Sequence, residues 1–273
     1  MSTTAYKSDP SCAKVLMLHA QGLTNNPGHG QSGQFFRCKT RFLQRKAEQI
    51  VLNAVQQDPS QSQVEVVEFH YPCAKLPVNP DQPEGEENHA WAWGYGDIDE
   101  DRIRGLEKSV TNIMRYIDKY GPFIGVMGFS TGATVATIVT SLLEKRESLC
   151  NFEFKTNHPP LEFAVSICGF TLANPFYKPV YSCIKTPFFH VIGTLDTMIH
   201  EYQCARLQEC CENSYTHYFK GTHYVPRSEE FLDALCRFFE EVLTVKGDKS
   251  RELQGGQEEA WEDCEDCEAG VLL

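Results

Sequence analysis

The chain has 273 residues, of which 41% are hydrophobic and 23% charged, with a formal net charge of −12. This composition is typical of a globular protein with one large α/β domain or two small domains, and the acidic balance argues against nucleic-acid binding, which needs a basic face. The first residues lack the apolar core of a signal peptide, and no run approaches the roughly 18 apolar residues of a membrane span, so we expect a cytoplasmic protein without membrane contact.

The first half of the chain predicts two strands and two helices. Short apolar runs are typical of buried strands, and apolar residues three or four positions apart are typical of a helix with one buried face. Between the second strand and the second helix, residues 72–101 contain four prolines, an acidic stretch and several aromatic residues, and no regular element is expected there. The expected strands are 13–18 and 64–69, and the expected helices are 35–55 and 102–120.

The second half continues this alternation, which implies an α/β fold with a mostly parallel, doubly wound sheet and helices on both faces. One domain is expected over residues 13–244, after an N-terminal extension of residues 1–12. Residues 245–273 are polar and acidic and are expected to form a disordered tail. The expected strands are 123–127, 162–168, 187–193 and 215–219, and helices are expected at 133–143, 200–211 and 231–242.

One pentapeptide carries the clearest chemical signal. Residues 128–132 read Gly-Phe-Ser-Thr-Gly and lie between a predicted strand and a predicted helix of small residues. A strand, a Gly-x-Ser-x-Gly turn and a helix describe a nucleophile elbow, in which the flanking residues must be small and the serine hydroxyl stands above the sheet. Ser130 is therefore the candidate nucleophile.

Two residues further along the chain could activate this serine. Asp196 follows the strand 187–193 and His223 follows the strand 215–219, so both fall beyond the carboxyl ends of strands, where parallel sheets carry functional groups. Taken alone, Asp196 could be a turn residue and His223 an ordinary loop histidine. A serine needs an adjacent base, and a carboxylate orients that base, so the order Ser, Asp, His predicts the catalytic triad of an α/β-hydrolase.

An oxyanion formed at this serine would need two backbone donors. One is expected to be the N–H of Thr131, directly after the nucleophile, and the other the N–H of Ala20 or Gln21, in the loop after the first strand. A plain turn is the alternative for that loop, and His19 is expected to be structural.

The segment 72–101 has two interpretations. Its aromatic residues Trp91, Trp93 and Tyr95 would roof the site and form an apolar acyl pocket, or the segment would be a surface loop whose aromatic residues complete the core. The basic residues of the first helix also have two interpretations. Lys39, Arg41, Arg45 and Lys46 would form a rim for an acidic carrier, but a solvated helix face explains them better.

The twelve cysteines are scattered through predicted strands and helices, for example Cys168, Cys183 and Cys236, and are expected to be buried reduced thiols. Cys264 and Cys267 form a Cys-x-x-Cys pair in the acidic tail without a second ligand pair. No metal site is predicted.

Four segments together resemble the FSH-type serine hydrolases, a group within the α/β-hydrolases that includes fungal enzymes similar to the lovastatin-pathway thioesterase. The resemblance spans roughly residues 13–243, and the stretch Gly-Gln-Phe-Phe-Arg-Cys-Lys-Thr at 33–40 is its most specific marker. The chain departs from the family at Ala20, where glycine is usual, and in a longer stretch between Thr24 and Gly33. The other matching segments are Leu18-His19, the elbow 128–133, and Gly-Thr-His-Tyr-Val-Pro at 221–226.

The resemblance implies the nucleophile at Ser130, the acid at Asp196 and the base at His223. It also implies hydrolysis of carboxylic esters or acyl-thioesters without a cofactor. In some relatives the reaction releases an acyl chain from the carrier domain of a polyketide synthase, in secondary metabolism. Two alternatives stay open, namely an acyltransferase that uses the same triad and a catalytically silent binding protein with this fold.

Overall fold

The computed structural model describes residues 11–20, 32–56, 63–78 and 90–255. Within them, six parallel strands form one sheet in the order β2-β1-β5-β6-β7-β8. This confirms the predicted α/β-hydrolase architecture. The strands are β1 (Cys12–Leu18), β2 (Val66–His70), β5 (Gly125–Phe129), β6 (Phe163–Ile167), β7 (Phe188–Gly193) and β8 (Ser214–Phe219).

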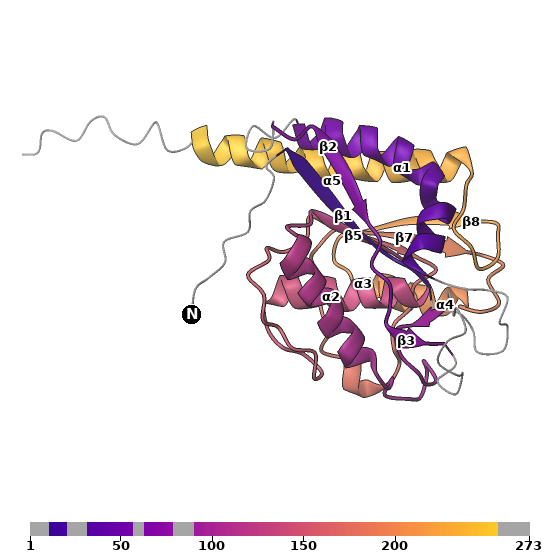
Figure 1. Cartoon of the computed structure of the whole chain (residues 1–273). Coiled ribbons are helices and arrows are strands. Elements are labelled where there is room, and N and C mark those ends of the chain that lie inside the picture. The colour runs from indigo at the N-terminus through magenta and orange to yellow at the C-terminus, as the bar shows by residue number, and fades with distance from the viewer. Residues whose placement is uncertain (1–10, 21–31, 57–62, 79–89, 256–273) are drawn as a thin grey trace, which may run out of the picture.

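Helices cover both faces of the sheet, because alternate residues of each strand point to opposite sides. In β1, Leu16 and Leu18 pack in the core that contains α2 (Leu106–Tyr120), α3 (Thr131–Lys145) and α4 (Glu201–Glu209). Val15 and Met17 pack in the other core, under α1 (Gly33–Gln56) and α5 (Glu229–Gly255). Figure 1 shows α1 and α5 side by side across one face.

Two helix boundaries differ from the sequence prediction. The helix expected over 102–120 begins only at Leu106, because Gly105 adopts a left-handed conformation (φ 81°) and Arg104 pairs with Tyr95 instead. At the other end of the domain, α5 continues to Gly255, past residue 244, where the folded domain was expected to end. Residues 256–273, with Cys264 and Cys267, and most of the segment 1–12 lie outside the described residues.

The segment 72–101 contains a small hairpin of β3 (Leu76–Pro77) and β4 (Trp91–Ala92), followed by a loop that is tied to the rest of the domain. The Ala173 N–H donates to the Ile98 carbonyl (3.0 Å). The Ile103 N–H, just after the segment, donates to the Tyr177 hydroxyl (2.8 Å). Residues 79–89 lie outside the described part. The described part of this segment is thus hydrogen-bonded to the body of the domain.

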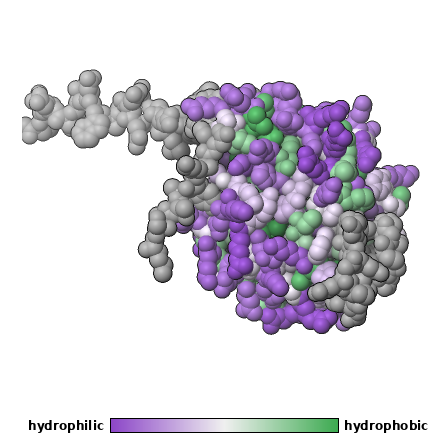
Figure 2. Space-filling model, in the orientation of Figure 1, coloured by the Kyte–Doolittle hydropathy of each residue, from purple (hydrophilic) through white to green (hydrophobic). Residues whose placement is uncertain are grey.

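The surface in Figure 2 is mostly hydrophilic, with scattered apolar residues. None of the helices in the described segments is long and apolar enough to cross a membrane. The thiols of Cys168 and Cys236 are buried as expected, whereas Cys183 is exposed, which corrects its predicted burial.

Candidate active site

Ser130 occupies the single position between the end of β5 and the start of α3. Its backbone has φ 55° and ψ −124°, a conformation that costs about 1–3 kcal/mol in a non-glycine residue. The tight turn also explains the two glycines. A Cβ atom at Gly128 would lie 2.4 Å from the Gly132 carbonyl oxygen, and one at Gly132 would lie 2.3 Å from the Leu18 and His19 carbonyl oxygens.

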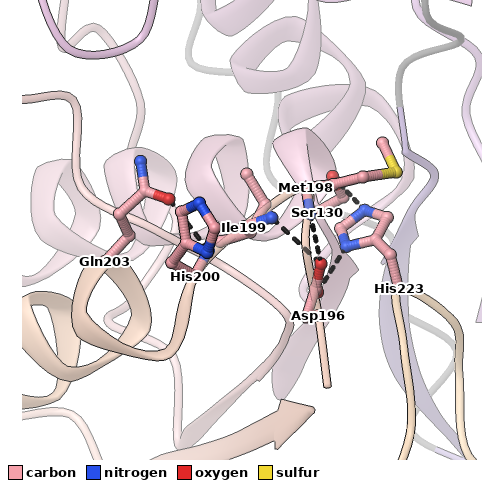
Figure 3. A network of polar contacts seen from close by, with 7 residues as sticks. All are labelled: Ser130, Asp196, Met198, Ile199, His200, Gln203 and His223. Carbon is pink, nitrogen blue, oxygen red and sulfur yellow. Dashed lines mark hydrogen bonds and ion pairs between the residues drawn. The ribbon is translucent and has the colours of Figure 1, made fainter. Parts of the chain in front are cut away.

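The three residues that the sequence singled out lie in one chain of hydrogen bonds (Figure 3). The His223 Nε2 atom is 2.9 Å from Ser130 Oγ, and His223 Nδ1 is 2.7 Å from Asp196 Oδ2. With Nδ1–H donating to the carboxylate, Nε2 accepts from the serine hydroxyl, which is the tautomer that a general base requires. The ring of Phe129 packs against the His223 imidazole, with centroids 4.9 Å apart.

Asp196 is fixed by its own loop. Its Oδ1 accepts the backbone N–H groups of Met198 (2.9 Å) and Ile199 (3.0 Å), while Oδ2 faces His223. Burial alone would raise the pKa of Asp196, but the hydrogen bonds from His223 and from these backbone groups outweigh burial and hold the pKa below its usual value. The carboxylate is therefore ionised and can stabilise a protonated His223.

Cys168 adds a group that the sequence analysis had treated only as a buried thiol. It follows β6 with φ 48°, and its Sγ lies within 4.8 Å of ligand atoms of Asp196 and His223. Burial raises the pKa of the Cys168 thiol, and the adjacent Asp196 carboxylate raises it further, so the group stays protonated and can donate to that carboxylate. The three ligand types could hold a metal ion. Because Asp196 and His223 already bond each other and the thiol is protonated, the arrangement fits an extended hydrogen-bond network better.

Two of the three expected oxyanion donors lie in the described residues. Thr131 is the first residue of α3, where helix N–H groups carry partial positive charge. Ala20 is buried two residues after the end of β1, and Gln21 lies outside the described residues. His19 is structural, as expected. Its Nδ1 donates to the Ala20 carbonyl (2.7 Å) and its Nε2 accepts the Ala74 N–H (3.0 Å), while burial lowers the pKa of His19 to about 4 and keeps the ring neutral.

A pocket of about 360 Å³ opens beside Ser130. Trp93 lines it, and the Trp93 indole N–H donates to the His19 carbonyl (2.7 Å). Trp91 and Tyr95 do not line it, because Trp91 pairs with Pro77 in the hairpin and the Tyr95 hydroxyl bonds the Pro77 carbonyl. Of the three aromatic residues that were expected to form an acyl pocket, the structure places only Trp93 in the lining of this cavity. Among the described residues, no charged side chain lines the pocket, and its lining consists of Trp93, Gly94, Gly96, Ile98, Ile103, Leu106, Ser130, Thr131, Thr134, Val135, Phe170, Leu172, Met198 and Ile199.

The parallel sheet, the strained serine between β5 and α3, and the hydrogen-bonded acid and base at neighbouring strand ends define the class of the α/β-hydrolases. The chain belongs to the serine hydrolase family FSH1, which it matches over residues 9–235.

Two relatives that are covered nearly in full are named as a serine hydrolase and an esterase. The chain is 28% identical to Family of serine hydrolases 2 from Saccharomyces cerevisiae over 238 residues, which cover 84% of this chain and 98% of that protein. It is 25% identical to Esterase OVCA2 from Danio rerio over 244 residues, which cover 82% of this chain and 97% of that protein. The chain is also 29% identical to a Dihydrofolate reductase from Schizosaccharomyces pombe over 160 residues. These residues cover 56% of this chain and 33% of that protein. The chain is thus a serine hydrolase by family.

Proposed function

We propose that this protein cleaves carboxylic esters or acyl-thioesters through an acyl-enzyme on Ser130. The observation that carries the proposal is the unbroken hydrogen-bond chain from Ser130 through His223 to Asp196, at the edge of an uncharged pocket. A nucleophile, a base and an orienting acid in this geometry are what acyl transfer requires.

In the proposed mechanism, His223 Nε2 takes the proton of Ser130 as Oγ attacks the substrate carbonyl carbon. The resulting oxyanion is held by the Thr131 N–H and by a donor from the 20–21 segment, each of which typically contributes about 10²–10³ in rate. The intermediate then collapses, the bond to the alcohol or thiol breaks, and this leaving group takes the proton from His223. A water molecule repeats the sequence on the acyl-enzyme and releases the acid.

The pocket defines the acyl group of the substrate. Because it is lined by apolar and small polar residues without a charge, an ionised acyl chain would lose its hydration there without a partner. We therefore propose uncharged, mainly apolar acyl groups, including the acyl or polyketide chain of a carrier-bound thioester as a second candidate substrate. No cofactor enters this chemistry, and the reaction would take place in the cytoplasm.

Labelling with a fluorophosphonate, read out as intact mass, tests the proposal. The wild type should gain one adduct and hydrolyse p-nitrophenyl esters, and Ser130→Ala should do neither while unfolding at the same urea concentration. A folded wild type that takes up no label would favour a catalytically silent binding protein. Undiminished ester hydrolysis by Ser130→Ala would refute the role of Ser130. Added alcohols or amines that divert the acyl group from water would identify an acyltransferase.

A further inference from the structure

A second cavity, of about 310 Å³, adjoins the pocket beside Ser130, which we call the acyl pocket. The walls of the second cavity are formed by α2, by residues 72–75 and by Trp93, and we call it the α2 cavity. Among the described residues, Trp93 alone lines both the acyl pocket and the α2 cavity. Its indole is therefore the wall that the two cavities share.

The two cavities follow one another along α2. Leu106, at the start of this helix, lines the acyl pocket, whereas Ser109 and Ile113 line the α2 cavity. Residues three or four positions apart lie on the same face of a helix, so these three side chains form one row. The row is about 10 Å long, because a helix rises by about 1.5 Å per residue. An acyl chain that followed this row would pass from the first cavity into the second if nothing lay between them.

Trp93 is held in place at this boundary. It is 2% exposed, and its indole N–H donates to the His19 carbonyl, just after β1 (2.7 Å). The rings of His19 and Trp93 also pack together, with centroids 5.0 Å apart. The next residue packs closely as well, because a Cβ atom at Gly94 would lie 2.4 Å from the Cγ2 atom of Ile103. A hydrogen bond, a ring contact and close backbone packing thus all hold the indole between the cavities.

The part of the α2 cavity that lies near Trp93 is apolar. Ile113 and Ala74 line it and are buried, and the Ala74 N–H donates to Nε2 of His19, the residue on which Trp93 packs (3.0 Å). The three cationic side chains of the lining are exposed and can keep their charges in water. Methylene groups would therefore find an apolar surface next to the indole. The three cations are Lys75, Arg115 and Lys119.

We propose that Trp93 limits the length of the acyl group that the enzyme accepts, because it closes the acyl pocket against the α2 cavity. This inference rests on the proposed hydrolase function. With the indole in place, methylene groups beyond the capacity of the acyl pocket stay in water and add nothing to the binding of the substrate. Without the indole, the two cavities would join into a space of nearly twice the volume of the acyl pocket, and a longer chain would extend into it.

The test measures kcat/KM for p-nitrophenyl esters from butanoyl to hexadecanoyl and compares the ratio of the dodecanoyl to the butanoyl ester. In the wild type, kcat/KM should stop rising with chain length once the acyl pocket is full. In Trp93→Ala, the ratio should be higher by about tenfold or more, since each methylene group that becomes buried contributes about fourfold. The matched control is Trp91→Ala, which removes the same side chain two residues away, where it lines neither cavity, and should keep the wild-type ratio.

Two further variants separate the wall from other effects of Trp93. Trp93→Phe keeps a ring at the boundary but loses the hydrogen bond to His19, so it should change kcat/KM for both esters alike and keep their ratio. Asn112→Phe fills part of the α2 cavity. By itself it should keep the wild-type ratio, and combined with Trp93→Ala it should cancel the gain for the dodecanoyl ester.

Three results would overturn the inference. A wild-type kcat/KM that keeps rising about fourfold per methylene group up to the hexadecanoyl ester would do so without any variant, even where Trp93→Ala does not fold. An unchanged ratio in folded Trp93→Ala, or a gain that survives Asn112→Phe, would do the same. All three leave the hydrolase function intact, because Ser130 would still be labelled and short esters cleaved. A folded wild type that takes up no fluorophosphonate and cleaves no ester would refute the function, and the role of Trp93 with it.

Discussion

The two oxygens of Asp196 have different tasks, and this difference predicts what an amide would do in their place. In Asp196→Asn, the two backbone N–H groups at Oδ1 would hold the amide oxygen there and turn the amide NH₂ toward His223. His223 Nδ1 would then have to accept a hydrogen bond from the amide, so His223 Nε2 would carry the proton. Ser130 would thereby lose its base. We expect kcat for ester hydrolysis to fall by about 10⁴ with the fold retained.

The matched control is Asp99→Asn, because Asp99 is an exposed carboxylate whose oxygen bonds Gln203 of α4 (3.3 Å). This variant should stay within about twofold of the wild type, as is usual for exposed substitutions. Asp196→Asn activity within tenfold of the wild type would show that Asp196 does not set the tautomer of His223.

His190 in β7 is a buried titratable residue outside the candidate site. Its Nε2 has no hydrogen-bond partner among the described residues, and burial lowers its pKa to about 4. The unfolded chain therefore binds a proton below about pH 6.5 that the folded chain excludes, so the free energy of unfolding falls as the pH drops from 6.5 toward 4 and is unaffected above 6.5. We expect His190→Phe to remove this contribution, which amounts to roughly 2 kcal/mol between pH 6.5 and pH 5.

Urea unfolding at pH 7.5 and at pH 5 measures the effect as the difference in free energy between the two conditions. Thr216 pairs with His190 across β7 and β8 and also has a buried hydroxyl without a partner in the described segments. Thr216→Val is therefore the control, since it removes an unpaired polar atom that does not titrate and should leave the pH dependence as it is. An equal pH dependence in His190→Phe and the wild type would contradict the prediction.

At the scale of elements, the junction of β1, β5 and α3 sets the position of the nucleophile. Gly132 packs so closely on the end of β1 that Gly132→Ala would push its methyl group into the Leu18 and His19 carbonyl oxygens. Either α3 or β1 must move, so we expect a loss of about 1–3 kcal/mol in unfolding free energy. The rate of fluorophosphonate labelling should fall as well, because the same shift displaces Ser130 and the segment that contains Ala20. Labelling at the wild-type rate would show that the elbow tolerates this displacement.

The sequence predicted the elements around this junction because their signals are local. A continuous apolar run indicates a strand of a covered parallel sheet, as in Phe163–Ile167, and the elbow motif places Ser130 in a turn between two elements. The start of α2 was missed because it depends on the pairing of Arg104 with Tyr95 and on the conformation of Gly105. Contacts between distant segments likewise decided that Trp93 lines the pocket and that Trp91 and Tyr95 do not.

Cys168 shows the same limit within the candidate site. Nothing near Cys168 in the sequence indicates an acid, because Asp196 reaches it only through the adjacent strands β6 and β7. The order of the triad residues can be read along the chain, whereas the contact between Cys168 and Asp196 depends on which strands lie side by side in the sheet.

At the scale of the whole molecule, segments far apart in the sequence meet in the pocket beside Ser130, and this predicts that a single residue of α3 can change the acyl selectivity of the proposed reaction. Val135 of α3 lines the acyl pocket, so Val135→Phe should fill part of it. The preference for an octanoyl over an acetyl p-nitrophenyl ester should then fall by about tenfold or more, because the longer chain loses several buried methylene groups at about 0.8 kcal/mol each. An unchanged preference between the two esters in Val135→Phe would show that the acyl chain of the substrate does not enter the pocket beside Ser130.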